Sequence, residues 1–330
     1  MLVYFPRIKF VSPSVLTQNI SIVLFFTLTT FGSFAQGDGP HTYLLAPKGV
    51  TGLNIKWLNL HQNISPPNIF TPGASVKVNV FPVTFFHTFS IKGVYTQAYF
   101  MINPGTVTAT ATKVPPMLPI PEGAKLISNG FSDGFAGMRV GLKGAPGLSV
   151  SSFIEEKMRF SLFADVRYWY SGTYDSKKIL NLGSNRSTVQ VSFPMAIPLN
   201  QNRERATWLE FSPSVEFFAD NRDPSRGNNA QTISQAPLYI LESHLSHNFN
   251  KKFWSSVSLR YRQGGETEAD GKADDNEMQI LGAAVGIGYQ ILPFLGVNAD
   301  YGQILYGYNG AESDMLRVAL VVSYANLKKK

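Results

Sequence analysis

The chain contains no cysteine and relatively few charged residues. Without cysteine it can form neither a disulfide framework nor a thiolate metal site, and it has no cysteine nucleophile. Charged residues make up 15% of its 330 positions, whereas a soluble domain of average composition carries roughly 25%. Part of the surface is therefore expected to face something other than water.

Long apolar runs are also scarce. The run Ile20–Phe31 has 12 residues, whereas a helix needs roughly 20 to cross a bilayer. Arg7 and Lys9 precede this run, and Ser33 and Ala35 follow it at the −3 and −1 positions of a small-residue cleavage site. This arrangement is typical of a secretory signal peptide. We expect cleavage after Ala35, so that residues 1–35 are removed, with a retained membrane anchor as the alternative.

The remaining residues, 36–330, are expected to form one domain in a bacterial envelope. No segment among them approaches the roughly 18 uninterrupted apolar residues that indicate a membrane-spanning helix. This excludes a helical inner-membrane protein. An exported chain without cysteine fits a bacterial envelope. Loss of Arg7 and Lys9 lowers the formal net charge from +7 to +5, and the tail Lys328–Lys330 is the only basic cluster. We therefore expect no nucleic-acid partner.

The chain does have segments in which apolar and polar residues alternate. Met158–Gly172 reads MRFSLFADVRYWYSG, in which every second residue belongs to one of two sets. One set is apolar and ends in Tyr168 and Tyr170, and the other includes Arg159 and Arg167. A period of two predicts a strand that presents its two sets of side chains to opposite environments.

Segments of this kind recur along the whole chain. They number about 12, and each has roughly 9–13 residues, the length that a tilted strand needs to cross a bilayer. Short and long connections alternate between them, which is typical of outer-membrane barrels. The predicted strands are Thr51–Leu60, Ser75–Phe89, Val94–Ile102, Gly134–Gly144, Met158–Gly172, Ser187–Ile197, Trp208–Asp220, Pro237–Phe249, Phe253–Gly264, Met278–Leu292, Leu295–Leu305 and Met315–Tyr324.

We therefore predict an all-β fold, a transmembrane antiparallel up-and-down β-barrel of about 12 strands in the outer membrane. Its apolar face would contact lipid, with Tyr168 and Tyr170 in an aromatic girdle, and its polar face would line the lumen. A soluble β-sandwich or lipocalin-like barrel is the alternative, because its strands alternate too. Its polar face would be richer in Lys and Glu than the Ser, Gly, Asn and paired charges found here.

The stretch from Tyr174, YDSKKILNLGSNRSTVQVSFPMAI, resembles a run of the form PTGxYDxxKxxNLGxNRW. That run belongs to a bacterial family named after the MetA pathway of phenol degradation, whose members are often called transporters. Ser187 stands where an aromatic residue is often found. The segments Gly130–Ser149 and Phe217–Asp223, and the segment that begins LESHLSHNFNKKFW at Leu241, are similar to other runs of the family.

The resemblance covers about Gly130 to Tyr324, and it departs from the family pattern at Gly134, where the family has proline. It implies an outer-membrane β-barrel thought to pass small molecules, including aromatic ones. It implies no catalytic residue and names no substrate.

The polar faces of the predicted strands supply the candidate lumen residues. An arginine ladder opposite a carboxylate ladder would form a polar pathway that orients a polar or anionic solute. A lumen filled by salt bridges is the alternative, because about 12 strands enclose a narrow interior. The lumen and transport candidates are Arg139, Arg159, Asp165, Arg167, Glu210, Glu216, Glu242, His244, Arg260, Arg262, Asp300 and Arg317.

Three further segments suggest other roles. In Glu242–His247 (ESHLSH), Ser243 and His247 share a face but lie about 13 Å apart at strand rise, so a catalytic pair would need a partner from another strand. Gly265–Glu277 holds six carboxylates without the ligand order of a calcium loop, which favours a solvated loop. The insert Asn103–Asp133 is either an inward-folding plug or a disordered loop.

The sequence thus predicts a passive channel or uptake protein for small molecules, including aromatic or hydrophobic ones. It would work by diffusion through a narrow lumen, with no cofactor, no metal and no enzymatic activity. A closed structural or loop-presenting barrel and a membrane-embedded hydrolase are the alternatives. The expected partners are outer-membrane lipid, a small-molecule solute and the barrel-assembly machinery during insertion.

Overall fold

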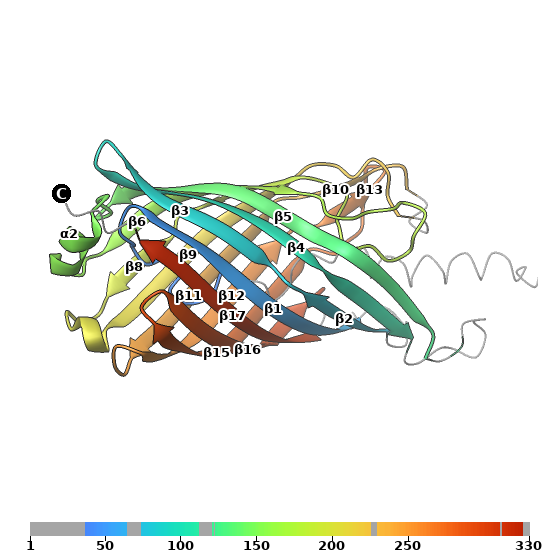
Figure 1. The fold of residues 1–330 in the computed structure, drawn as a ribbon. Coiled ribbons are helices and arrows are strands. Elements are labelled where there is room, and N and C mark those ends of the chain that lie inside the picture. The colour runs from blue at the N-terminus through green and yellow to red at the C-terminus, as the bar shows by residue number, and fades with distance from the viewer. Residues whose placement is uncertain are drawn as a thin grey trace, which may run out of the picture.

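In a computed structural model, the chain forms a closed antiparallel β-barrel (Figure 1). The structure describes residues 37–64, 74–111, 121, 123–225, 230–310 and 312–325, so the predicted signal peptide and its cleavage site lie outside the described residues. The elements are β1 (Val50–Ile64), β2 (Ala74–Val80), β3 (Val83–Ile91), β4 (Val94–Ala111), β5 (Lys125–Lys143), α2 (Val150–Glu155), β6 (Ser161–Tyr170), β7 (Thr188–Ser192), β8 (Met195–Pro198), the 3-10 turn η1 (Arg203–Arg205), β9 (Thr207–Phe218), β10 (Ile233–Gln235), β11 (Leu238–Asn248), β12 (Phe253–Gly264), β13 (Thr267–Ala269), β14 (Lys272–Ala273), β15 (Met278–Leu292), β16 (Leu295–Tyr308) and β17 (Glu312–Ala325).

The barrel wall has 12 strands, as predicted. Two of these strands are each interrupted once, so that β2 and β3 are segments of one strand, and β7 and β8 are segments of another. Pro82 separates β2 from β3, and Pro194 separates β7 from β8. Proline has no N–H for the ladder, but both prolines still accept through their carbonyls, from Lys56 N–H and Phe163 N–H at 2.8 Å. The first and last strands close the barrel, with β1 paired to β17 from Val50↔Ala325 onwards.

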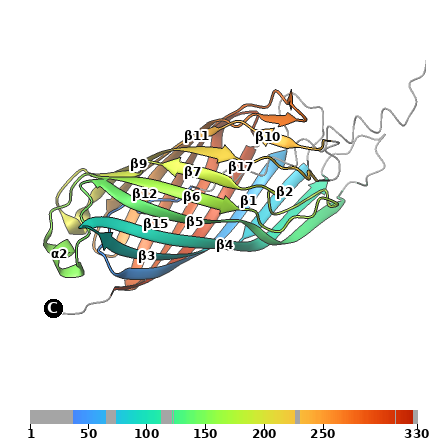
Figure 2. The ribbon, with the colours of Figure 1, turned by 90° about the horizontal axis from the view of Figure 1, so that it is seen from above.

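The two ends of the barrel differ. α2 and the C-terminal end of β17 lie at one end, and β10 and β13 lie at the other (Figure 1, Figure 2). The first end carries short turns, such as Lys92–Gly93, which fits the periplasmic side of an outer-membrane barrel. The loops at the second end are longer, and β10, β13 and β14 form a small separate sheet there.

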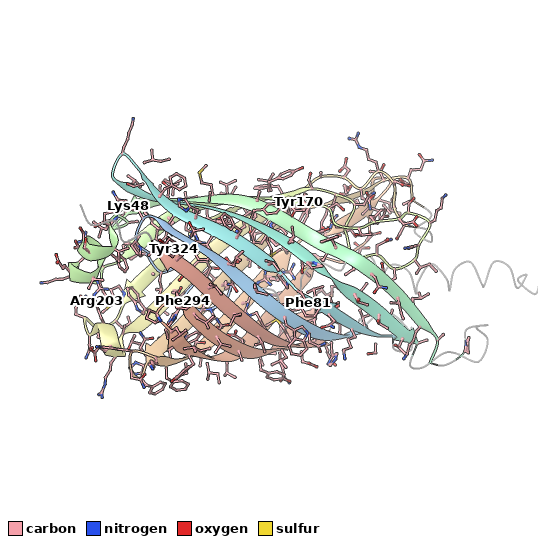
Figure 3. The ribbon with its side chains drawn as sticks, in the orientation of Figure 1. Lys48, Phe81, Tyr170, Arg203, Phe294 and Tyr324 are labelled. Atoms are coloured by element: carbon pink, nitrogen blue, oxygen red, sulfur yellow. The ribbon has the colours of Figure 1, made fainter. Side chains whose placement is uncertain are left out.

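The alternating faces lie as predicted. In β6, Val166 and Tyr168 are 49% and 52% exposed on the outside, whereas Phe163, Asp165 and Arg167 are buried on the inside. Figure 3 shows large apolar side chains over the outer surface, including Phe81, Phe294 and Tyr324. An apolar outside with buried charges inside is the reverse of a soluble barrel, so the outer surface fits lipid.

No helix among the described residues is long and apolar enough to cross a membrane.

The prediction for the insert Asn103–Asp133 was wrong over most of its length. β4 continues to Ala111 and β5 begins at Lys125, and the two strands pair from Thr110↔Lys125 to Asn103↔Ser132. A register shift between Met101 and Asn103 absorbs Pro104. The described part of the insert is therefore an extended hairpin of the barrel wall, not an inward plug.

Candidate functional site in the barrel lumen

A different segment occupies the lumen. Gly37–Gly49, which we call the plug, precedes β1 and is bound by charged side chains of the wall. Arg167 donates from Nη1 to Asp38 Oδ1 at 2.8 Å, Arg139 to the Thr42 carbonyl at 2.7 Å, and Arg317 to the Gly37 carbonyl at 2.8 Å. Three arginines that the sequence assigns to a solute pathway thus hold the chain itself.

Two wall carboxylates bind the backbone of the plug. Glu210 accepts the N–H groups of His41 and Tyr43, at 2.8 Å and 2.9 Å. Glu242 accepts those of Asp38 and Gly39, at 3.2 Å and 3.1 Å. Both carboxylates are buried, and a buried charge requires hydrogen-bonding partners of this kind. The plug therefore supplies the donors that make these charges tolerable inside the barrel.

Close packing also fixes the plug. The His41 ring lies 4.4 Å from the Trp254 ring, and its Nε2 lies 3.0 Å from Ser246 Oγ. Gly39 has φ +91°, and a side chain there would overlap the Arg317 guanidinium. Tyr43 is buried beneath Arg139, whose guanidinium carbon lies 5.3 Å from its ring centre. The plug thus occupies the lumen at the level of these residues and narrows the axial path there.

The other wall charges are largely paired with one another. Arg139 Nε lies 2.8 Å from Asp165 Oδ2, and Arg317 Nε lies 3.2 Å from Asp300 Oδ2. Tyr99 donates its hydroxyl to Asp165. This arrangement favours the salt-bridged interpretation of the lumen over the open arginine and carboxylate ladders.

The predicted candidates separate into two groups. Eleven of the 12 lie on lumen-facing positions of their strands, and Gln190 donates to one of them, Glu216, at 3.3 Å. Arg159 is different, because it precedes β6, pairs with Glu156 at the periplasmic end, and has a side chain that is 44% exposed. Its placement as a lumen residue from the alternation was wrong, since the strand begins only at Ser161.

A serine, a histidine and a carboxylate do meet across strands. Ser258 Oγ on β12 lies 2.7 Å from His244 Nδ1 on β11, and His244 Nε2 lies 2.9 Å from Glu242 Oε1. In a Ser-His-Asp triad, the histidine Nε2 faces the serine and Nδ1 faces the carboxylate. Here the two contacts are exchanged, because Nδ1 faces the serine and Nε2 faces the carboxylate. Glu242 also holds the plug, and His244 is buried. The described contacts of this cluster thus fasten the plug.

The outer half of the lumen contains two apolar clusters. Inward side chains of β1, β2, β4 and β17, among them Leu60, Val76 and Met315, pack with Leu180 and Leu182 from the loop between β6 and β7. A second cluster combines Leu238, Ile240, Met278 and Ile280.

The loop that carries Leu180 and Leu182 is anchored at the outer mouth. Asp133 accepts the N–H groups of Gly172 and Ser184 at 2.8 Å and 3.0 Å. The Arg186 guanidinium lies over the Phe218 ring, at 4.8 Å, and burial lowers the pKa of Arg186 to about 10. This loop, which we call the lid, is thus folded, with Leu180 and Leu182 turned inward.

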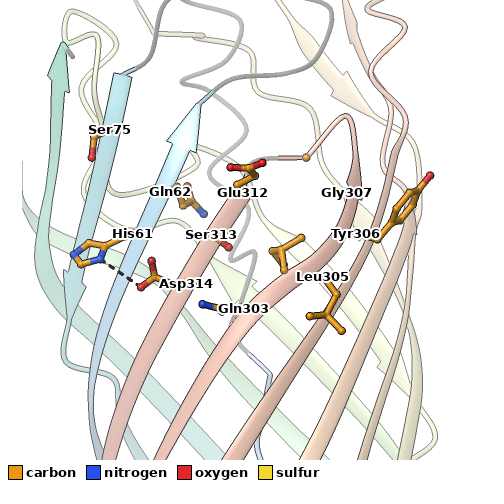
Figure 4. Close-up of a pocket in the computed structure, with 12 residues that line it drawn as sticks. His61, Gln62, Ser75, Gln303, Leu305, Tyr306, Gly307, Glu312, Ser313 and Asp314 are labelled. Carbon is orange, nitrogen blue, oxygen red and sulfur yellow. Dashed lines mark ion pairs between the residues drawn. The ribbon is translucent and has the colours of Figure 1, made fainter. Parts of the chain in front are cut away.

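The barrel wall is split at its outer rim between β16 and β17. The pairing of these strands stops at Gln303↔Asp314, although both continue. Above that point, Leu281 on β15 pairs with Tyr306, and Gln62 on β1 pairs with Ser313. β16 and β17 therefore follow different neighbours and separate from each other (Figure 4).

A recess of about 630 Å³ lies at this split. Its lining includes Ile304, Leu305 and Tyr306 of β16 and Ser313 of β17 (Figure 4). Leu305 is 63% exposed. The unpaired ends of β16 and β17 thus leave a recess in the barrel wall at its outer rim.

A smaller cavity of about 60 Å³, which we call the inner cavity, lies deeper in the wall. It shares Gln303 and Ile304 with the recess, so these two residues separate the two spaces. Its lining also includes Arg260, Arg262 and Arg317, next to the plug glycine Gly39. The recess and the inner cavity thus follow one another from the split toward the plug.

The sequence signal for the plug was weak but present. The segment GDGPHTY has two glycines around a single acid and lies just before the first strand. The split left no such signal, because it depends on which neighbour each strand end pairs with. No group of three or more His, Cys, Asp or Glu side chains that could hold a metal occurs within the described ranges.

The comparisons with known structures agree with this architecture. The COG4313 outer membrane channel from Pseudomonas putida F1 superposes with a TM-score of 0.71 at 16% identity, over 87% of this chain and 100% of that one. The beta domain of the Bordetella autotransporter BrkA gives a TM-score of 0.50 at 11% identity, over 83% and 100% of the two chains. At these identities the likeness shows the fold. No curated protein matches the sequence.

A family model matches directly at the level of sequence. It is described as "Putative MetA-pathway of phenol degradation" and covers residues 122–320, which is more than half of the chain. The match spans the wall from the loop before β5 to within β17, including the lid, the split and the wall charges. The chain, an outer-membrane β-barrel by fold, therefore belongs to this phenol-degradation family.

Proposed function

We propose that this barrel takes up small hydrophobic molecules, including aromatic ones, through the side opening between β16 and β17. The observation that carries the proposal is the end of strand pairing at Gln303↔Asp314, beside a recess of about 630 Å³. The plug and its buried hydrogen bonds oppose axial flow of water and ions. The two apolar clusters of the outer lumen favour solutes that bury apolar surface.

The proposal includes the location of the protein. It works in the outer membrane, to which a signal peptide cleaved after Ala35 and the barrel-assembly machinery deliver it. Lipid surrounds the exposed apolar side chains, and a solute partitioning into the outer leaflet reaches the split without crossing the aqueous mouth. Diffusion down a gradient suffices, with no cofactor.

The test compares two probes in cells that express the chain and in cells that do not. An intact outer membrane slows both N-phenylnaphthylamine, which is hydrophobic and fluoresces in lipid, and nitrocefin, which is polar and is cleaved in the periplasm by β-lactamase. We expect faster uptake of N-phenylnaphthylamine and an unchanged nitrocefin rate. Faster nitrocefin influx alone would identify a polar axial channel, and no change in either would leave the closed structural or loop-presenting barrel.

A membrane-embedded hydrolase is the second candidate, because Ser258, His244 and Glu242 lie in contact. The buried ring and the binding of Glu242 to the plug argue against turnover. We expect the purified barrel to hydrolyse 4-nitrophenyl butyrate no faster than its Ser258→Ala variant. Hydrolysis that is lost in Ser258→Ala would instead establish the enzyme.

A further inference from the structure

Exposed cations gather along one part of the periplasmic rim. The strands β5, β6, β8, β9, β11 and β12 follow one another as neighbours in the wall, so the links at their periplasmic ends form one continuous arc. Figure 3 shows Arg203 at this end of the barrel. The exposed cations of the arc, which we call the basic arc, are Lys143, Lys157, Arg159, Arg203, Arg205, Lys251 and Lys252.

The basic arc keeps a net positive charge after its own carboxylates are counted. The same links hold three carboxylates, Glu155, Glu156 and Glu204, against seven cations, which leaves a formal net charge of +4. Glu156 pairs with Arg159, and Glu204 lies 2.9 Å from Lys251 Nζ. At the opposite end of the barrel, the outer loop 265–277 holds six carboxylates and one lysine. The periplasmic arc is therefore the end that attracts anions.

The short helix α2 is fastened to this arc. Arg203 donates from Nη2 to the Phe153 carbonyl at 2.8 Å and also to the Glu156 carbonyl. Its guanidinium carbon lies 5.4 Å from the centre of the Phe153 ring. These contacts join the link that carries α2 to the link that carries η1. They hold Ile154, which is 64% exposed, at a fixed place among the cations.

The cations begin where the apolar outer surface ends. Leu142 and Phe160 are exposed on the outside, and the next residues toward the periplasm along the chain are Lys143 and Arg159. Leu199, which is also exposed, precedes the link with η1. In a membrane, this boundary lies at the level of the phospholipid head groups. Lysine and arginine side chains suit this level, because their stems cover apolar surface while their charges reach the polar layer.

We propose that the basic arc binds anionic phospholipids, such as phosphatidylglycerol, in the inner leaflet of the outer membrane. The lipid phosphate would contact the cations, and its acyl chains would lie on Leu142, Phe160 and Leu199. Membrane binding at such a surface combines buried apolar area with attraction to anionic head groups. A soluble acidic protein would use only the charge. The inference rests on the proposed location in the outer membrane and goes beyond the proposed uptake.

The experiment measures lipid binding to the full barrel, purified from expressing cells in detergent, by native mass spectrometry. The probes are phosphatidylglycerol and the zwitterionic phosphatidylethanolamine with the same acyl chains, and glycerol 3-phosphate. We expect phosphatidylglycerol to bind about tenfold more tightly than phosphatidylethanolamine. The preference should shrink when the salt concentration rises from about 0.1 M to about 0.5 M, because salt screens exposed charges. Glycerol 3-phosphate, which lacks acyl chains, should not bind measurably.

Two variants assign the preference to the basic arc. The arc variant spares Arg203, which fastens α2, and the two paired cations, and it replaces the other four by glutamine. It combines Lys143→Gln, Lys157→Gln, Arg205→Gln and Lys252→Gln. The matched control removes the same charge from exposed positions of the outer loops, by Lys125→Gln, Lys177→Gln, Lys178→Gln and Lys272→Gln. The arc variant should lose the preference and keep its affinity for phosphatidylethanolamine, whereas the control should keep both.

Three results would overturn the inference. Equal affinity of the wild-type barrel for the two lipids would leave the arc to a soluble acidic partner in the periplasm, and this result depends on no variant. Glycerol 3-phosphate binding as tightly as phosphatidylglycerol would identify a simple phosphate site. An equal loss of preference in the arc variant and the control would show an effect of overall charge. Heat-modifiable gel migration reports whether each variant has folded, and the uptake of N-phenylnaphthylamine decides the proposed function separately.

Discussion

Deletion of the plug, residues 37–49, is expected to convert a barrel of low or unmeasurable conductance into one with discrete current steps at least several-fold larger. The physical reason is that the plug fills the polar part of the lumen, where Asp38, His41 and Tyr43 contact the wall. Water and ions would replace it, since the wall there carries charged side chains that water solvates. Planar-bilayer recordings of the purified barrel measure the effect.

A second variant separates loss of the plug contacts from loss of chain length. A Gly-Ser linker of equal length in place of residues 37–49 keeps the connection to β1 but removes the side chains and the Pro40 constraint. It should conduct like the deletion. Heat-modifiable migration on gels checks that both barrels fold, because buried Glu210 and Glu242 lose their backbone donors.

A folded deletion variant whose conductance equals that of the wild type would contradict the plug as the axial barrier. In that case the lid with Leu180 and Leu182 would have to close the barrel by itself. A smaller substitution gives an intermediate test. Asp38→Asn removes one of the two carboxylates that pair with the buried Arg167 and leaves Asp165 as the other. Breaking a buried pair costs up to about 3–5 kcal/mol, so this substitution should loosen the plug and produce flickering openings.

The wall of the barrel could be predicted because its signal is local. In β6, the alternation of apolar and polar residues identifies Val166 and Tyr168 as outward and Asp165 as inward. The assignment is reliable because successive side chains of a strand point to one of only two faces. The strand count also held, because Pro82 and Pro194 interrupt strands without turning the chain. Local periodicity and turn spacing together determine this much of the fold.

The plug could not be predicted in this way, because its partners are distant in the sequence. Arg317 holds Gly37 across 280 positions, and Glu242 holds Gly39 across 203. The segment has no periodicity, and its contacts are mainly between backbone groups and wall charges. A sequence can name Arg317 and Glu242 as lumen residues, but only the folded barrel shows that they bind the chain itself.

The insert was misread for a related reason. Pro104 and Gly105 are typical of a turn, yet a register shift lets β4 pass through them. The Pro104 carbonyl even accepts the Phe81 N–H at 2.8 Å. Beyond them, Val107 and Ala109 alternate with threonines and face inward. Turn-forming residues thus predict a chain reversal only where no neighbouring strand pairs with them.

The second large effect is expected from a disulfide that fastens the base of the split. Gln303→Cys with Asp314→Cys joins the last register pair of β16 and β17. Opposed residues of antiparallel strands have Cα atoms about 4.5–5.5 Å apart, which lies within the range that a disulfide spans. The chain has no cysteine of its own, so the pair forms the only possible bridge.

With the bridge formed, uptake of N-phenylnaphthylamine should fall to the rate of cells that lack the protein, and dithiothreitol should restore it. The reason is that the inner cavity beyond Gln303 has only about 60 Å³, too little for this probe, so its passage from the recess toward the lumen requires β16 and β17 to separate further. Conductance should not change, since the plug governs the axial route.

Two controls isolate the split. Val297→Cys with Leu320→Cys bridges the same two strands at a register pair nearer the periplasmic end and should leave uptake unchanged. Asp314→Cys alone removes the carboxylate that lies 3.4 Å from His61 without forming a bridge, and it should behave like the wild type. If the oxidised Gln303–Asp314 pair transports as fast as its reduced form, the hydrophobic route does not widen the split, and solutes must instead enter through the lid.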